Sequence, residues 1–112
     1  MRIAIPVVQG KLSPHFGHCD EFAIVDVDSE TKRISEIRMM NAPAHEPGAL
    51  PRWLNEQEVQ LVIAGGMGGR AQMLFAESGI DVLVGAPTES AEEIASMYLR
   101  GTLQTGANIC DH

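Results

Sequence analysis

Two short segments of this chain contain the side chains that bind soft and borderline metal ions. The segment Ser13–Cys19 (SPHFGHC) has two imidazoles and a thiol, and Cys110-Asp111-His112 ends the sequence. These are the only two cysteines, and each has a histidine within two residues. Imidazole and thiolate groups at such spacing can bind one metal ion or a metal–sulfur cluster. The candidate metal ligands in the two segments are His15, His18, Cys19, Cys110 and His112.

These residues also have simpler interpretations. A histidine in such a loop can hydrogen-bond the backbone, and a free cysteine is often a small buried hydrophobic residue. Three ligands can bind a metal with an open coordination position, whereas a closed zinc site needs a fourth, for which Cys110 and His112 are candidates. The chain has no paired C-x-x-C knuckles, which disfavours structural zinc. A thiol redox pair of Cys19 and Cys110 stays open.

A second loop, Asn41–Gly48 (NAPAHEPG), contains His45 between two prolines. His45 is a further candidate ligand, or a hydrogen-bond donor to a bound cluster, although a single loop histidine is more often an ordinary surface residue. Thioether sulfurs are also soft ligands, and we expect three methionines, Met39, Met40 and Met67, to lie near these loops. Core packing is the expected role of Met39 or Met40. Met67, between two pairs of glycines, is harder to assign to the core.

The glycine turn Gly65–Gly69 (GGMGG) follows a short apolar run and precedes a helical pattern. Gly66, Gly68 and Ala71 match the G-x-G-x-x-A dinucleotide pattern, but the next strand lacks the acidic residue that would confirm it. No Gly-Lys-Ser/Thr follows, which excludes a P-loop. Free backbone N–H groups at a helix start suit an anionic ligand, such as a phosphate or an anionic metal–sulfide cluster. A tight turn for close packing is the alternative.

Composition limits the classes of function. The 112 residues correspond to one domain, and 45% apolar residues are enough for a hydrophobic core. A formal net charge of −7 without a basic patch disfavours nucleic-acid binding. We find no signal-peptide pattern and no apolar stretch near the roughly 18 residues of a membrane helix, so we expect a cytoplasmic protein. No Ser nucleophile elbow, HExxH motif or convincing pair of carboxylates is present, so we do not expect an enzyme.

Hydrophobic periodicity predicts the order β-β-β-α-β-α-β-α. In the third strand Ile34 and Ile37 break strict alternation, which indicates a β-bulge. Ser90-x-x-Glu93 is a capping box that opens the last helix, and Gly101 ends it. We assign residues 1–101 to a single α/β domain and residues 102–112 to a polar tail. The predicted strands are Arg2–Val8, Glu21–Asp28, Arg33–Met40, Gln60–Ala64 and Ile80–Val84, and the helices start at Leu50, cover Arg70–Ser78 and follow Ser90.

This order predicts an α/β sandwich with a mixed five-stranded sheet and about three helices. If the first three strands form a meander, the first and third are parallel, and strands that follow helices normally run the same way. The loops after these strands then meet at one edge of the sheet, where open α/β sheets bind ligands. The loops expected there are Ser13–Cys19, Asn41–Gly48, Gly65–Gly69 and Gly85-Ala86-Pro87.

Three segments together resemble the dinitrogenase iron–molybdenum cofactor biosynthesis family. They are Ser13–Gly17 (SPHFG) before Phe22–Val27 (FAIVDV), Val62–Gly69 (VIAGGMGG), and Ala71–Val82 (AQMLFAESGIDV). The likeness extends through Gly101 and implies a ribonuclease H-like α/β sandwich, but it does not imply nuclease activity. It also implies that the first loop, the His45 loop and the glycine turn line a cluster pocket. The residues so implied are Ser13, His15, Phe16, Gly17, His45, Gly65, Gly66, Met67, Gly68 and Gly69.

The sequence therefore predicts a monomeric or weakly self-associating protein that binds, stores or delivers a metal–sulfur cluster of the iron, molybdenum or copper type. Its partner would be a protein that donates or accepts the cluster. His18-Cys19 and the Cys-Asp-His tail depart from the residues we associate with the family, which predicts tighter or thiolate-based binding. The alternatives are a phosphate- or nucleotide-binding module at Gly65–Gly69 and a thiol redox protein that uses Cys19 and Cys110.

Overall fold

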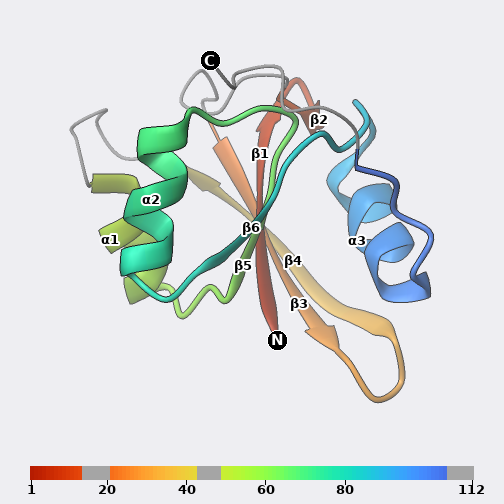
Figure 1. Ribbon diagram of the computed structural model, residues 1–112. Coiled ribbons are helices and arrows are strands. Elements are labelled where there is room, and N and C mark those ends of the chain that lie inside the picture. Colours follow the sequence, from red (N-terminus) through yellow and green to blue (C-terminus); the bar gives the residue numbers. More distant parts are fainter. Residues whose placement is uncertain (14–20, 43–48, 106–112) are drawn as a thin grey trace.

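A mixed β-sheet lies between two layers of helices in the computed structural model (Figure 1), which describes residues 1–13, 21–42 and 49–105. Helices α1 and α2 lie on one face of the sheet, and α3 lies on the other. This architecture confirms the predicted α/β sandwich. The elements are β1 (Arg2–Val8), β2 (Lys11–Leu12), β3 (Glu21–Asp28), β4 (Arg33–Asn41), α1 (Ala49–Glu56), β5 (Leu61–Ile63), α2 (Gly69–Glu77), β6 (Asp81–Leu83) and α3 (Ala91–Arg100).

The strand order in the described sheet is β4-β3-β1-β5-β6, with β2 paired to β1 beside this path. Strands β1, β3 and β4 form an antiparallel meander, whereas β5 and β6 run parallel to β1. The sheet has six strands rather than the five predicted. The extra strand is β2, whose two residues place Leu12 opposite Val7, and a run this short has no periodicity to read.

The sheet is covered on both faces because its strands alternate between two hydrophobic clusters. Ile3, Ile5 and Val25 point to the cluster that α3 completes with Ile94 and Ala95. The opposite cluster takes alternate strand residues together with helix residues from α1 and α2. Its fully buried members include Ala4, Phe22, Ile24, Leu54, Val62 and Phe75.

A register shift between Asp26 and Val27 confirms the predicted bulge in β4. Val27 pairs with Ile34 and Asp26 pairs with Glu36, so Ser35 is the extra residue. The Ser35 hydroxyl donates a hydrogen bond to the Asp26 carbonyl oxygen over 3.0 Å. Because one residue is added, Ile34 and Ile37 come to the same face of the sheet, which explains their spacing in the sequence.

Helix α3 begins and ends where its sequence signals predict. Ser90 is its N-cap, and the Ser90 hydroxyl accepts a hydrogen bond from the Glu93 amide over 3.2 Å. Gly101 ends it in the left-handed region, with φ 73°. Across the described residues, none of the helices has the length and apolar character needed to cross a bilayer.

Candidate functional site

The candidate site is the edge of the sheet at which β1, β4, β5 and β6 have their carboxyl ends. These four strands share one direction, and β3 runs the opposite way between two of them. Val7 pairs with Glu21, and Glu21 pairs with Asn41, so the end of β1, the start of β3 and the end of β4 lie side by side. The predicted convergence at one edge is therefore confirmed for the described residues that flank the loops.

The first loop leaves this edge from a fixed position at Ser13. Ser13 is buried, and its amide donates to the Pro6 carbonyl oxygen over 2.8 Å. The Leu12 amide donates to the Glu89 carbonyl oxygen over 2.8 Å, which ties β2 to the segment before α3. The first bond joins Ser13 to β1 and the second reaches a residue far along the chain, so the start of the histidine-containing loop is positioned by β1 and by the segment before α3.

The glycine turn is anchored at both of its ends. The Gly85 amide donates to the Gly65 carbonyl oxygen over 2.9 Å, and Ala86 donates to Ala64 over 3.2 Å. These bonds continue the β5–β6 pairing beyond the strands. At the other end, the Gln72 side-chain amide donates to the Met67 carbonyl oxygen over 2.9 Å. The turn is thus held in place before any ligand binds, which lowers the entropic cost of binding.

The N-terminus of α2 lacks both kinds of side chain, an N-cap and first-turn acidic residues, that offset the positive end of the helix dipole in α3. Gly68 is the N-cap of α2 and provides no side-chain hydrogen bond, and the first turn has no acidic residue. In α3 the Ser90 hydroxyl caps the helix, and Glu92 and Glu93 stand in the first turn. The first N–H groups of a helix have no partner within the helix and carry its positive dipole end. Among the described residues, no side chain caps these groups in α2, which suits them to bind an anion.

The two glycines that open α2 are not required by packing. A Cβ added at Gly68 or Gly69 would have no described atom within 4 Å, and neither residue has a positive φ. Both residues are exposed. Packing against the described residues therefore does not require glycine at these two positions. The open space above them gives a ligand direct access to the backbone amides.

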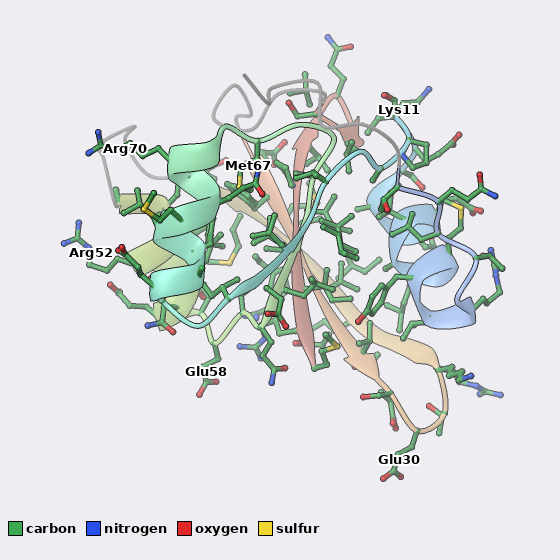
Figure 2. All side chains as sticks on the ribbon, in the orientation of Figure 1. Lys11, Glu30, Arg52, Glu58, Met67 and Arg70 are labelled. Carbon is green, nitrogen blue, oxygen red and sulfur yellow. The ribbon has the colours of Figure 1, made fainter. Side chains whose placement is uncertain are left out.

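Charge and exposure at this helix start also favour an anion. Arg70 is exposed at the second position of α2, and Figure 2 shows its side chain at the end of the helix next to the glycine turn, pointing away from the sheet. Met67 lies between α2 and the sheet in the same view. The Arg70 guanidinium adds a positive charge to an edge of a protein whose formal net charge is −7.

A hollow of about 490 Å³ adjoins the glycine turn on the α3 side. Gly85 belongs to its lining and is also the residue that hydrogen-bonds Gly65. Sequence reasoning missed this hollow, because its walls come from a turn, from α3 and from what was assigned to a polar tail. The full lining is Gly85, Pro87, Met97, Thr102, Gln104 and Thr105.

The structure gives the Met67 side chain a packing role. Met67 is fully buried in the cluster formed with α1 and α2. Its backbone carbonyl oxygen accepts the hydrogen bond from the Gln72 side-chain amide, so this buried residue helps to fix the glycine turn in place. Met40 is half-buried against the same cluster, as expected, whereas Met39 is 49% exposed. Contact between a ligand and the Met67 side chain stays a prediction.

The remaining candidate residues lie outside the described ranges. They are His15, Phe16, Gly17, His18, Cys19, His45, Cys110 and His112, which include every histidine and cysteine of the chain. Within residues 1–13, 21–42 and 49–105, no three His, Cys, Asp or Glu side chains are grouped closely enough to bind a metal ion. The described part of the edge thus supplies the glycine turn, Ser13 and the hollow, while the metal ligands stay predictions.

A second hollow, of about 740 Å³, lies at the opposite edge of the sheet. Its polar groups already have partners: Arg2 Nε donates to Asp26 Oδ1 over 2.6 Å, and Arg2 Nη1 donates to the Gln57 carbonyl. The hydrogen bond to Asp26 raises the pKa of Arg2, against a smaller opposing effect of desolvation. This arrangement ties the start of β1 to β3 and to the end of α1, and we assign it a structural role.

Comparison with known proteins identifies the family. The model of the family described as "Dinitrogenase iron-molybdenum cofactor" matches residues 1–101. The chain belongs to this family. The resemblance inferred from the sequence motifs is therefore confirmed, and the match ends at the residue that terminates α3.

The chain is also similar to individual proteins and solved structures. An uncharacterised protein of Methanocaldococcus jannaschii is 32% identical over 107 residues, which cover 93% of this chain and 90% of the relative. The crystal structure of PH0822 superposes with a TM-score of 0.85 at 27% identity and covers 94% of each chain. The apo form of the orange protein from Desulfovibrio gigas has the same fold, with a TM-score of 0.72, 20% identity and coverage of 96% of this chain and 93% of that one.

Proposed function

We propose that this member of the family binds a metal–sulfur cluster at the carboxyl edge of its sheet and stores it or delivers it to another protein in the cytoplasm. The cluster is cargo, so the role is binding and transfer rather than catalysis. Membership of the dinitrogenase iron-molybdenum cofactor family supports this class of cargo. The described edge supports the position, since the glycine turn, Ser13 and the hollow beside Gly85 all lie there.

The observation that carries the proposal is the uncapped N-terminus of α2. Its amides have no side-chain cap, its first turn has no carboxylate, and Gly68 and Gly69 leave open space above them. Metal–sulfide clusters with thiolate ligands are commonly anionic, and backbone N–H groups stabilise such charge. In an acidic protein, a helix start that has a glycine N-cap and no acidic side chain in its first turn is suited to bind an anion.

The predicted ligands are close in sequence to described residues of this edge. Cys19 precedes Glu21 by two residues, and Cys110 follows Thr105 by five. Cys19 and His15 are the proposed principal ligands. The proposed additional ligands are His18, His45, Cys110 and His112.

The first test is elemental analysis, with acid-labile sulfide, of protein purified anaerobically from its native host. We expect molybdenum, iron or copper together with sulfide in stoichiometric amounts. Zinc without sulfide would point to a structural or hydrolytic site and would contradict the proposal. A metal-free protein that also fails reconstitution with iron and sulfide, or with thiomolybdate and copper, would contradict it as well.

The second test compares two substitutions of the α2 N-cap. Gly68 has φ −64° and ψ 154°, a conformation that both Asn and Asp adopt at N-caps, and no described atom blocks a side chain there. Gly68→Asp adds a negative charge at the helix start, and Gly68→Asn adds nearly the same volume without charge. We expect Gly68→Asp to reduce cluster occupancy far more than Gly68→Asn does. Equal occupancy in both variants would contradict an anionic ligand at this helix.

The same helix start favours a phosphate-bearing ligand as the second candidate. Free amides, open glycines and Arg70 would bind a phosphate group as well as a cluster. Thermal stabilisation by nucleotides that persists in the presence of chelators would support this alternative. Stabilisation by the cluster, lost on chelation, would support the carrier function.

A further inference from the structure

Strand β4 is a long and uncovered edge of the sheet. It occupies one end of the strand order, and within the described ranges it pairs only with β3. Its nine residues contain no proline, whereas β6 at the other end has only three residues. An edge strand offers a row of backbone N–H and C=O groups to another strand, and proteins usually shorten or block such edges. The β6 edge is shortened, and the β4 edge is not.

The face of β4 that points toward the α3 side has exposed apolar residues. Ile37 is 38% exposed and Met39 is 49% exposed, although their β3 partners Val25 and Ala23 are fully buried. Residues directly opposite each other in a ladder point to the same face. Helix α3 covers the start of β4, where Ile34 packs against the same cluster, and leaves Ile37 and Met39 uncovered.

The other face of β4 has two opposite charges on either side of Ile37. Glu36 and Arg38 are two residues apart, and the Arg38 Nε lies 3.9 Å from Glu36 Oε2, which is too long for a hydrogen bond. This Nε is buried without a hydrogen-bond partner in the structure as described. Glu36 and Arg38 thus form a long ion pair without a hydrogen bond, and the Arg38 Nε has no acceptor among the described residues.

These features are complementary to a second copy of the same strand. In an antiparallel pair centred on Ile37, Glu36 stands opposite Arg38 of the second copy, and Arg38 stands opposite its Glu36. Ile37 stands opposite Ile37 of the second copy, on the face of the sheet that α3 covers in part. Moving the centre to Glu36 or to Arg38 would place two like charges opposite each other, which destabilises a sheet.

We propose that β4 pairs with β4 of a second copy, centred on Ile37, in a two-fold symmetric dimer with one continuous sheet. A C2 interface uses the same surface on both subunits, as this self-complementary pattern requires. The interface of one strand is small against the roughly 1,200 Å² of a standard stable contact, so the dimer forms weakly and depends on concentration. Antiparallel pairing directs the carboxyl edges of the two sheets in opposite directions, so both candidate sites stay open.

Sedimentation velocity over a concentration series of the full-length chain tests this proposal. We expect reversible dimerisation of the unaltered protein. Glu36→Arg places two arginines opposite each other, and Arg38→Glu places two glutamates there. Each should weaken dimerisation about tenfold or more, and tenfold corresponds to about 1.4 kcal/mol. Glu30→Arg, at the exposed hairpin tip, is the control for net charge and should have little effect.

The decisive measurement mixes the two single variants. A Glu36→Arg chain paired with an Arg38→Glu chain has opposite charges at both positions, so the mixture should form heterodimers about as strong as the original dimer. Circular dichroism and thermal melting verify that each variant is folded. A protein that stays monomeric at the highest concentration, single variants that dimerise as strongly as the unaltered protein, or a mixture that fails to associate would each overturn the proposal. None of these results depends on cluster binding.

Discussion

The amide of Gly85 donates a hydrogen bond to the carbonyl oxygen of Gly65 over 2.9 Å, which joins the turn after β6 to the turn after β5. This bond places the hollow of the α3 side directly beside the glycine turn that opens α2. Two surfaces made by different parts of the chain therefore form one edge. The glycine turn offers backbone amides to a ligand, and the hollow, lined in part by Gly85, lies on the α3 side of the same edge.

Replacing two glycines by alanine should have opposite effects on stability. Gly69 lies in the first turn of α2 without a positive φ, so Gly69→Ala should raise the free energy of unfolding by about 0.5–1 kcal/mol. Gly79 has φ 76°, so Gly79→Ala should lower it by about 1–2 kcal/mol. Neither added Cβ meets an atom within 4 Å among the described residues. Urea unfolding measures both, and effects of the same sign would contradict this reasoning.

Removal of the α3 cap should destabilise the protein. Ser90→Ala removes the acceptor of the Glu93 amide, and loss of an N-cap costs about 1 kcal/mol. The matched control is Ser96→Ala within the same helix, where alanine is the better helix former and should cost nothing. Chemical denaturation compares the two. If Ser96→Ala is as destabilising as Ser90→Ala, the cap is not the cause.

The contribution of Arg2 to stability should not change across the neutral pH range. Its hydrogen bond to Asp26 raises the pKa of Arg2 above the ordinary value. A group with a raised pKa stabilises the fold at every pH below its unfolded pKa and loses this effect only as the pH rises through the folded value. Arg2→Met should therefore lower the free energy of unfolding by the same amount between about pH 6 and pH 9. If the destabilisation caused by Arg2→Met disappeared between about pH 6 and pH 9, the titration of another group would be responsible.

Cys19→Ser should reduce cluster occupancy if thiolate coordination contributes to the proposed function. A hydroxyl is a hard ligand and replaces a thiolate poorly at a soft metal. The measured quantity is metal and sulfide per protein after anaerobic reconstitution. Cys110→Ser, five residues beyond Thr105, tests the tail separately. Full cluster occupancy in the Cys19→Ser variant would show that the Cys19 thiolate is not a ligand. The role of the helix amides would still be tested by the Gly68 variants.

The sequence by itself determined the features that arise between near neighbours. The bounds of β1 and β3, the capping of α3 by Ser90 and its end at Gly101 follow from alternation and from hydrogen bonds that span three or four residues. The bulge in β4 was also readable, because the spacing of Ile34 and Ile37 breaks a period of two. The order of elements was enough, with general rules of chain topology, to predict that four strands end at one edge.

Only the tertiary structure decided the features that depend on residues far apart in the chain. Pairing of β2 with β1, burial of Met67 and the hollow between Gly85 and Thr105 have no local signature. The same holds for the uncovered part of β4, which depends on how far α3 extends across the sheet. The physical reason is that burial is settled by which surfaces pack together, whereas periodicity and capping motifs describe a segment one turn or a few residues at a time.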